Sequence, residues 1–243
     1  MTQRLNVIEE LKLNFEVPYV SDRGESIDCV NVTLNECRHG VDISYALLET
    51  SRGYVDDLFP SEGVDILALN AKKVLQELGV KPQRLILQLW EFGTNGRTFS
   101  VEGRAPVNKT RDTVLLMLTK TPFVYKYGYN LMLWHQGCHA KDRLEYRFPS
   151  AHPLVQVGAW LDSLWHFSID GRLEKWGKPH YSREERLAEA ARVFKDSAGL
   201  TEVHAVDLAA RACGDLWGKE VTLADLLAIA NEAGLGCANS QSG

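Results

Sequence analysis

The feature that most constrains the fold of this chain is a single change in hydrophobic periodicity near residue 150. Before that point apolar residues mostly alternate with polar ones, which is typical of strands that bury one face of a sheet. After it they recur every three or four residues, as in amphipathic helices. We therefore predict an α+β fold, with a mainly antiparallel sheet in about the first 145 residues and three to four helices after it.

Segments of alternating or β-rich sequence predict the strands of this sheet. They cover 11–19, 30–34, 41–45, 84–92, 99–101, 114–119 and 123–135. Asn95-Gly96 separates two of them and predicts a tight hairpin, because both residues tolerate a positive φ. One helix interrupts the strands at 64–78, with an apolar face ending before Gly79. Because strands and helices are segregated, the pattern argues against a doubly wound nucleotide-binding fold.

The second part of the chain carries helix signals with recognisable starts. A helical segment follows Pro153, and Ser182 with Glu185 has the spacing of a capping box. Further helices are predicted at 206–217 and at 223–233, the latter capped by Thr222. We accordingly predict a β-rich α+β domain at 1–148, a helical domain or extension at 149–236, and a flexible tail at 237–243.

Composition excludes several classes of protein. Hydrophobic residues make up 45% of the 243 residues, which is enough for a core and too many for a disordered chain. No apolar run is long enough to cross a membrane, and the acidic start of the chain is unlike a signal peptide. The five cysteines form no C-x-x-C pair, which favours reduced thiols. We expect a cytoplasmic protein with no membrane partner.

The charge of the chain is unevenly distributed. The formal net charge is -5, yet residues 97–150 hold nine Lys/Arg against four Asp/Glu. Within this basic segment, the predicted strand 123–135 places Tyr125, Tyr127 and Tyr129 on one face. Tyrosines on an exposed strand stack unpaired bases, and neighbouring cations contact phosphates. The alternative is that these tyrosines face the core of an ordinary strand.

The leading hypothesis is therefore a non-catalytic accessory subunit that binds single-stranded RNA or DNA, alone or within a larger ribonucleoprotein complex. The acidic helical part would bind a protein partner. The residues assigned to nucleic acid on this hypothesis are Arg97, Arg104, Lys109, Arg111, Lys120, Tyr125, Lys126, Tyr127, Tyr129, Lys141 and Arg143.

A second hypothesis is an enzyme, namely a nuclease that uses His135 and His139 as base and acid, either without metal or with zinc. Imidazole and thiolate are ligands that zinc prefers, so the candidate metal ligands are Cys37, His39, His135, Cys138 and His139. No cofactor is expected on the leading hypothesis, and zinc is the alternative. The sequence contains no G-x-G-x-x-G, P-loop, G-x-S-x-G or H-E-x-x-H motif, which lowers the expectation of the commonest enzymes. A third hypothesis is an enzyme acting on a small molecule.

Overall fold

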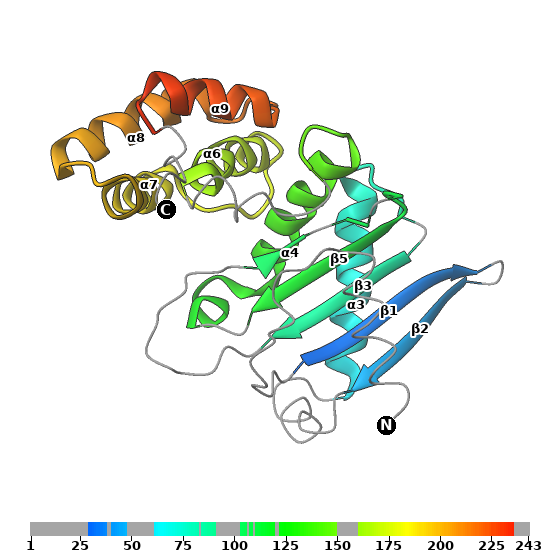
Figure 1. The fold of residues 1–243 in the computed structure, drawn as a ribbon. Helices are drawn as coiled ribbons and strands as arrows, with labels where there is room; N and C mark the ends of the chain where they lie inside the picture. Colours follow the sequence, from blue (N-terminus) through cyan, green and yellow to red (C-terminus); the bar gives the residue numbers. More distant parts are fainter. Residues whose placement is uncertain are drawn as a thin grey trace, which may run out of the picture. The chain divides into compact units, whose positions relative to one another are not determined.

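The structure is a computed structural model that describes residues 29–37, 40–47, 61–82, 84–90, 103–105, 107–108, 110–119, 122–149 and 160–235 (Figure 1). The chain divides into two compact units, Met1–Tyr146 and Arg147–Gly243. Each unit contains its own set of buried apolar side chains. None of the helices in the described ranges combines the length and the hydropathy needed to cross a lipid bilayer.

The described part of the first unit contains a five-stranded sheet with the strand order β2–β1–β3–β5–β4. Its strands are β1 (Cys29–Cys37), β2 (Gly40–Leu47), β3 (Arg84–Trp90), β4 (Gly103–Arg104) and β5 (Thr113–Thr119). Strand β1 pairs antiparallel with both β2 and β3, and the short β4 pairs antiparallel with β5 at one edge. The strands β3 and β5 are parallel, with Leu85 opposite Val114. The sheet is therefore mixed.

Strand β5 shows why the alternating pattern fails in the middle of this sheet. Val114, Leu115 and Leu116 are consecutive, and each is 0% exposed. A strand that is covered on both faces carries a continuous apolar run, whereas a strand with one wet face alternates. Parallel pairing also requires a crossover, because the chain must return from the end of β3 to the start of β5. The segment 91–112 makes this connection.

Helix α3 (Ser61–Glu77) lies where the sequence predicts a helix, and it packs against β1, β3 and α4. Its predicted apolar face is confirmed for Ala71, Val74 and Leu75, which are all buried. Gly79 follows with a φ of 76°, and its N–H donates to the carbonyl of Gln76 at 3.0 Å. Glycine ends the helix here because the left-handed conformation carries no steric cost without a Cβ.

Helix α4 (Pro122–Leu144) replaces the strand predicted at 123–135. Proline is common at the first position of a helix, since its missing N–H would have no partner there in any case. Residues 131–140 are all buried, so the helix is surrounded by protein on every side over almost three turns. Lys141 and Arg143 lie in the last turn, where positive charge interacts favourably with the helix dipole.

The predicted fold class, an α+β chain with a mainly antiparallel sheet in the first 145 or so residues, is therefore wrong. The described residues are mostly helical, with six helices, and the neighbouring strands β3 and β5 run parallel. Tyrosine and tryptophan favour strands, but burial on all sides outweighs that preference at 131–140. Because α4 is a helix, Tyr125, Tyr127 and Tyr129 do not alternate on a sheet face.

The second unit consists, in its described part, of four helices: α6 (Trp160–Lys175), α7 (Arg183–Ala198), α8 (Glu202–Leu216) and α9 (Leu223–Glu232). Helix α6 contacts each of the other three. Twelve of its sixteen residues are buried, which is the pattern of a helix at the centre of a bundle. The stacked rings of Phe148 and Trp165, with centroids 3.6 Å apart, anchor its first half.

The predicted helix starts at Ser182 and Thr222 are confirmed. The Ser182 hydroxyl accepts from the Glu185 N–H at 3.2 Å, and the Glu185 carboxylate accepts from the Ser182 N–H at 3.0 Å. At α9, Thr222 and Asp225 form the same reciprocal arrangement. Each box satisfies two backbone donors that the first turn of a helix leaves without helical partners. Of the helix predicted at 153–165, the described residues 160–165 form the first turns of α6, which runs on to Lys175.

The capping box of α9 predicts a pH-dependent contribution to stability. Hydrogen bonds from the Thr222 hydroxyl and N–H, both 2.7 Å, lower the pKa of the Asp225 carboxyl from its ordinary value of 3.8. A carboxyl whose pKa is lower in the folded state than in the unfolded state stabilises the fold at pH values above the unfolded-state pKa. This stabilisation is lost as the pH falls through the folded-state pKa. Asp225→Asn should therefore unfold at lower urea than the wild type at pH 7, with the difference shrinking below pH 3.8. Thr222→Ala should cost about 1 kcal/mol at pH 7. An Asp225→Asn deficit that is equal at pH 7 and pH 3 would contradict this account.

Several predicted elements lie outside the described residues. They are the strand at 11–19, the Asn95-Gly96 hairpin with its outer strand at 99–101, and the tail at 237–243.

Candidate functional site

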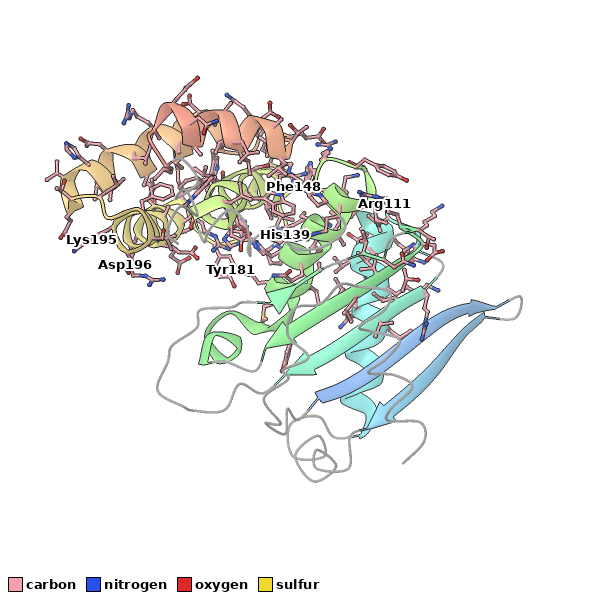
Figure 2. All side chains as sticks on the ribbon, in the orientation of Figure 1. Arg111, His139, Phe148, Tyr181, Lys195 and Asp196 are labelled. Carbon is pink, nitrogen blue, oxygen red and sulfur yellow. The ribbon has the colours of Figure 1, made fainter. Side chains whose placement is uncertain are left out.

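The candidate site of the first unit is a pair of histidines on α4. His135 and His139 are four residues apart, so their side chains lie one turn apart on the same face of the helix. Their ring centroids are 5.0 Å apart and the planes are inclined at 72°. His135 is 0% exposed and His139 is 4% exposed. Figure 2 labels His139 on this helix.

The other sides of α4 are occupied by its own unit. A Cβ on Gly137 would lie 2.8 Å from the Leu78 side chain, so α3 packs closely on this side of α4. Gly137 is two residues from His135, and therefore faces away from the histidine pair. Arg143 follows His139 by four residues, and its guanidinium donates to the carbonyl of Ala105 at 3.1 Å. Ala105 directly follows the edge strand β4, so this bond ties the edge of the sheet to α4 one turn after His139.

Gln136 is a further buried polar residue of this helix. It lies seven residues before Arg143, which places it on the same side of α4 as the Ala105 contact. Its side chain is 2% exposed, and its Oε1 accepts no hydrogen bond from the described residues. A buried acceptor without a donor is uncommon and indicates either strain or a ligand that completes it.

The spacing of this site has a known chemical meaning. Two histidines at i and i+4 on a helix are the pair with which H-E-x-x-H metallopeptidases bind zinc, and the glutamate of that motif is the general base. Here the run His135-Gln136-Gly137-Cys138-His139 keeps both histidines at this spacing and has glutamine where that motif has glutamate. The run therefore differs from H-E-x-x-H at one residue.

The second unit contains a buried cluster of charged residues around His166 on α6. His166 Nδ1 lies 3.9 Å from a carboxylate oxygen of Glu189, and Glu189 is also bound by the Arg186 guanidinium. Arg186 Nε donates to Asp170 at 2.6 Å, with side chains that are 2% and 0% exposed. Burial would raise the pKa of the Glu189 carboxyl, but the positive charge of Arg186 holds that pKa well below its ordinary range. A carboxylate on one ring nitrogen is the usual partner of a metal-binding histidine.

The candidate metal ligands from the sequence are only partly described. His135, Cys138 and His139 are on α4, and Cys138 is 0% exposed. Cys37 is the last residue of β1, where its side chain lies outside the described part, as does His39. The structure therefore brings together His135 and His139.

The residues assigned to nucleic acid are spread over several elements. Arg97, Lys109 and Lys120 lie outside the described residues, as do the side chains of Arg104, Tyr125, Lys126 and Tyr127, and Tyr129 is half-buried on α4. The described cations among them have partners within their own unit. Arg111 stacks over the Tyr146 ring at 3.9 Å, Lys141 pairs with Glu145, and Arg143 is buried and donates to Ala105.

Sequence reasoning missed Gln136 and Asp142. Both residues were missed because 123–135 was interpreted as a strand that ends at His135. Neighbours in a strand lie on opposite faces, and no helix was predicted that would place later residues beside the histidines. On a helix, Asp142 shares the face of His135 and His139, and it is 0% exposed. The available signal was the spacing His135-x₃-His139 directly after a Pro122 that can begin a helix.

Comparison with known proteins adds no relative to this description. No protein-family model matches the chain, and neither a curated protein nor a solved structure matches it.

Proposed function

We propose that this chain is a zinc-dependent hydrolase and that His135 and His139 of α4 bind the ion. The observation that carries the proposal is the buried histidine pair at i and i+4, with rings 5.0 Å apart. Two imidazoles in this arrangement bind one ion on the face of a helix.

A zinc ion bound by these histidines would supply Lewis acidity and would lower the pKa of a coordinated water.

The substrate class that we propose is an extended peptide. Strand β4 lies at the edge of the sheet, and an edge strand presents backbone groups with which an extended chain can pair. Arg143 ties the residue after β4 to the helix that carries the histidines. A peptide added along β4 would thus lie on a segment fixed to the proposed zinc site.

The nucleic-acid hypothesis stays a prediction. Its geometric basis was a tyrosine-bearing strand, and the helix α4 removes that basis. The nuclease alternative shares His135 and His139 with the present proposal, so one set of variants tests both.

The first experiment measures metal content in the purified full chain. We expect about one zinc per chain by elemental mass spectrometry, and a lower melting temperature after chelation. His135→Ala and His139→Ala should each retain less than about a tenth of the zinc after dialysis, because a ligand is lost. The control is His204→Ala, which removes an exposed histidine of α8 and should retain zinc.

Two results would contradict the proposal. A zinc-free wild type whose melting temperature is insensitive to added zinc would exclude the metal site. Cleavage of an RNA oligonucleotide, together with no cleavage of fluorogenic peptides, would assign the site to a nuclease. We expect chelator-sensitive cleavage of peptides.

A further inference from the structure

Helix α8 of the second unit has an exposed side that carries apolar residues. Its opposite side packs on α6 and α7 (Figure 1), where Leu208 and Ala212 are buried. On the exposed side, Val203 is 70% exposed, Val206 is 51% exposed, and Ala210 is exposed as well. These three residues are three and four positions apart, so they form one apolar stripe along the helix. The stripe gives α8 a surface against which a second helix can pack.

A row of polar side chains runs along α8 beside this stripe. It consists of His204, Asp207, Arg211 and Asp215. The spacings are three, four and four residues, all four residues are exposed, and groups that donate alternate with carboxylates. Arg192 and Asp196 on α7, also four residues apart, form an ion pair. Within the described part of the chain, no side chain of the row has a hydrogen-bond or ion-pair partner, so the row can pair with groups from outside the unit.

We propose that α8 binds α8 of a second copy of this chain in an antiparallel arrangement, about a two-fold axis at the level of Ala209. The order of charges in the row is self-complementary about this axis. Asp207 of one copy lies opposite Arg211 of the other, and the symmetry repeats the pair with the copies exchanged. At the ends of the row, His204 comes within one residue of the level of Asp215 in the second copy. A two-fold contact thus pairs each charge of the row with an opposite charge or a hydrogen-bond donor.

The apolar stripe favours the same arrangement. A two-fold axis brings the same side of both helices together, so the stripes pack on each other and Val203 and Val206 are shielded from water. Parallel helices in register would instead place Asp207 against Asp207 and Arg211 against Arg211, and like charges repel. The contact involves one helix of 15 residues from each copy. This is small for a dimer interface, so we expect a dissociation constant on the order of 100 µM.

The test measures the mass of the full chain by sedimentation equilibrium over a range of about 5 to 500 µM, which brackets this constant. We expect the mass of the wild type to rise from monomer toward dimer. Asp207→Arg and Arg211→Asp each place like charges opposite one another at both symmetric contacts, and each should weaken the dimer at least about tenfold. The matched control is Arg192→Asp on α7, which changes an exposed arginine in the same way and should dimerise like the wild type.

An equimolar mixture of the two charge variants tests the pairing itself. Asp207→Arg leaves arginine at both positions, and Arg211→Asp leaves aspartate at both. Each contact between the two different chains therefore joins opposite charges, and we expect a heterodimer about as tight as the wild-type dimer. Native mass spectrometry separates this heterodimer from the homodimers by mass. Val206→Glu places a charge in the apolar stripe and should also weaken the dimer, so the proposal stays testable if a charge variant fails to fold.

Three results would overturn the proposal. A wild type that is monomeric up to about 500 µM, well above the expected constant, would leave this face of α8 to a different protein. A wild-type dimer that Val206→Glu and both charge variants leave unchanged would place the contact on another surface. Weakened variants whose mixture forms no heterodimer would exclude the pairing of Asp207 with Arg211. The inference uses residues of α8 alone, so none of these results depends on the proposed zinc site.

Discussion

Gly171→Ala is expected to destabilise the second unit by about 3 kcal/mol. Gly171 is in the middle of α6, where alanine would ordinarily be the better helix former. A Cβ at this position would lie 2.1 Å from the backbone nitrogen of Gly218 and 2.8 Å from the carbonyl carbon of Trp217. These are backbone atoms, so the clash is relieved only by moving α6 away from the turn that follows α8. Urea unfolding followed by circular dichroism measures the loss.

The control for this prediction is Gly214→Ala on α8. A Cβ at Gly214 meets no atom within 4 Å, and the residue is exposed. The same substitution should therefore raise stability by about 0.5–1 kcal/mol, since it removes a flexible residue from a helix. Opposite signs at the two glycines would show that the effect of Gly171→Ala arises from backbone packing. A loss below about 0.5 kcal/mol at Gly171 would contradict that close approach.

Asp170→Ala is expected to cost 3–5 kcal/mol, about the range for breaking a buried ion pair from one side. The Asp170 carboxylate accepts from Arg186 Nε at 2.6 Å and from the Tyr181 N–H at 3.3 Å. Arg186 is 2% exposed and also stacks over the Tyr181 ring at 4.1 Å. Loss of the Asp170 carboxylate leaves the buried Arg186 guanidinium with less compensating negative charge. Because the guanidinium is buried, water cannot take the place of the carboxylate. Equilibrium unfolding in urea gives the difference directly.

A surface pair on α7 provides the comparison. Arg192 and Asp196 are 3.7 Å apart, with side chains that are 57% and 62% exposed (Figure 2). Asp196→Ala should change the free energy of unfolding by less than about 0.5 kcal/mol, because water solvates both charges when the pair is broken. Losses of similar size at Asp170 and Asp196 would show that burial does not determine how much the Asp170 contact contributes to the free energy of unfolding.

The elements that the sequence predicts correctly are those whose signals are local. The boxes at Ser182 and Thr222 depend on residues three positions apart, and the end of α3 depends on a glycine at one position. Helix α4 was missed because its signal is not local. Its aromatic residues favour a strand, and only burial on every side, supplied by α3 and the sheet, accounts for the helix. The parallel pairing of β3 and β5 was missed for the same reason.

The candidate site was predictable in its chemistry and not in its geometry. The sequence singled out His135 and His139 as the most reactive cluster, since imidazoles are scarce and these two are close together. Their one-face arrangement follows only from the helix. A search for H-E-x-x-H could not find Gln136, because that motif requires glutamate. Gln136 is distinguished by a buried Oε1 that accepts no hydrogen bond from the described residues, and only the structure shows this.

The pairing of the first unit's strands sets the order in which the chain can fold. Val32 pairs with Leu87, and Leu87 in turn pairs with Leu116, so the sheet joins segments that are far apart in the sequence. The helices α6, α7 and α8 are instead packed against their neighbours in the chain. Because closing long loops costs entropy before any contact forms, non-local sheets fold more slowly than local helical bundles. The first unit leaves the ribosome first, yet the second unit has the topology that folds faster. His135 and His139 thus gain their rigid support late, once β5 and α3 have enclosed the helix that carries them.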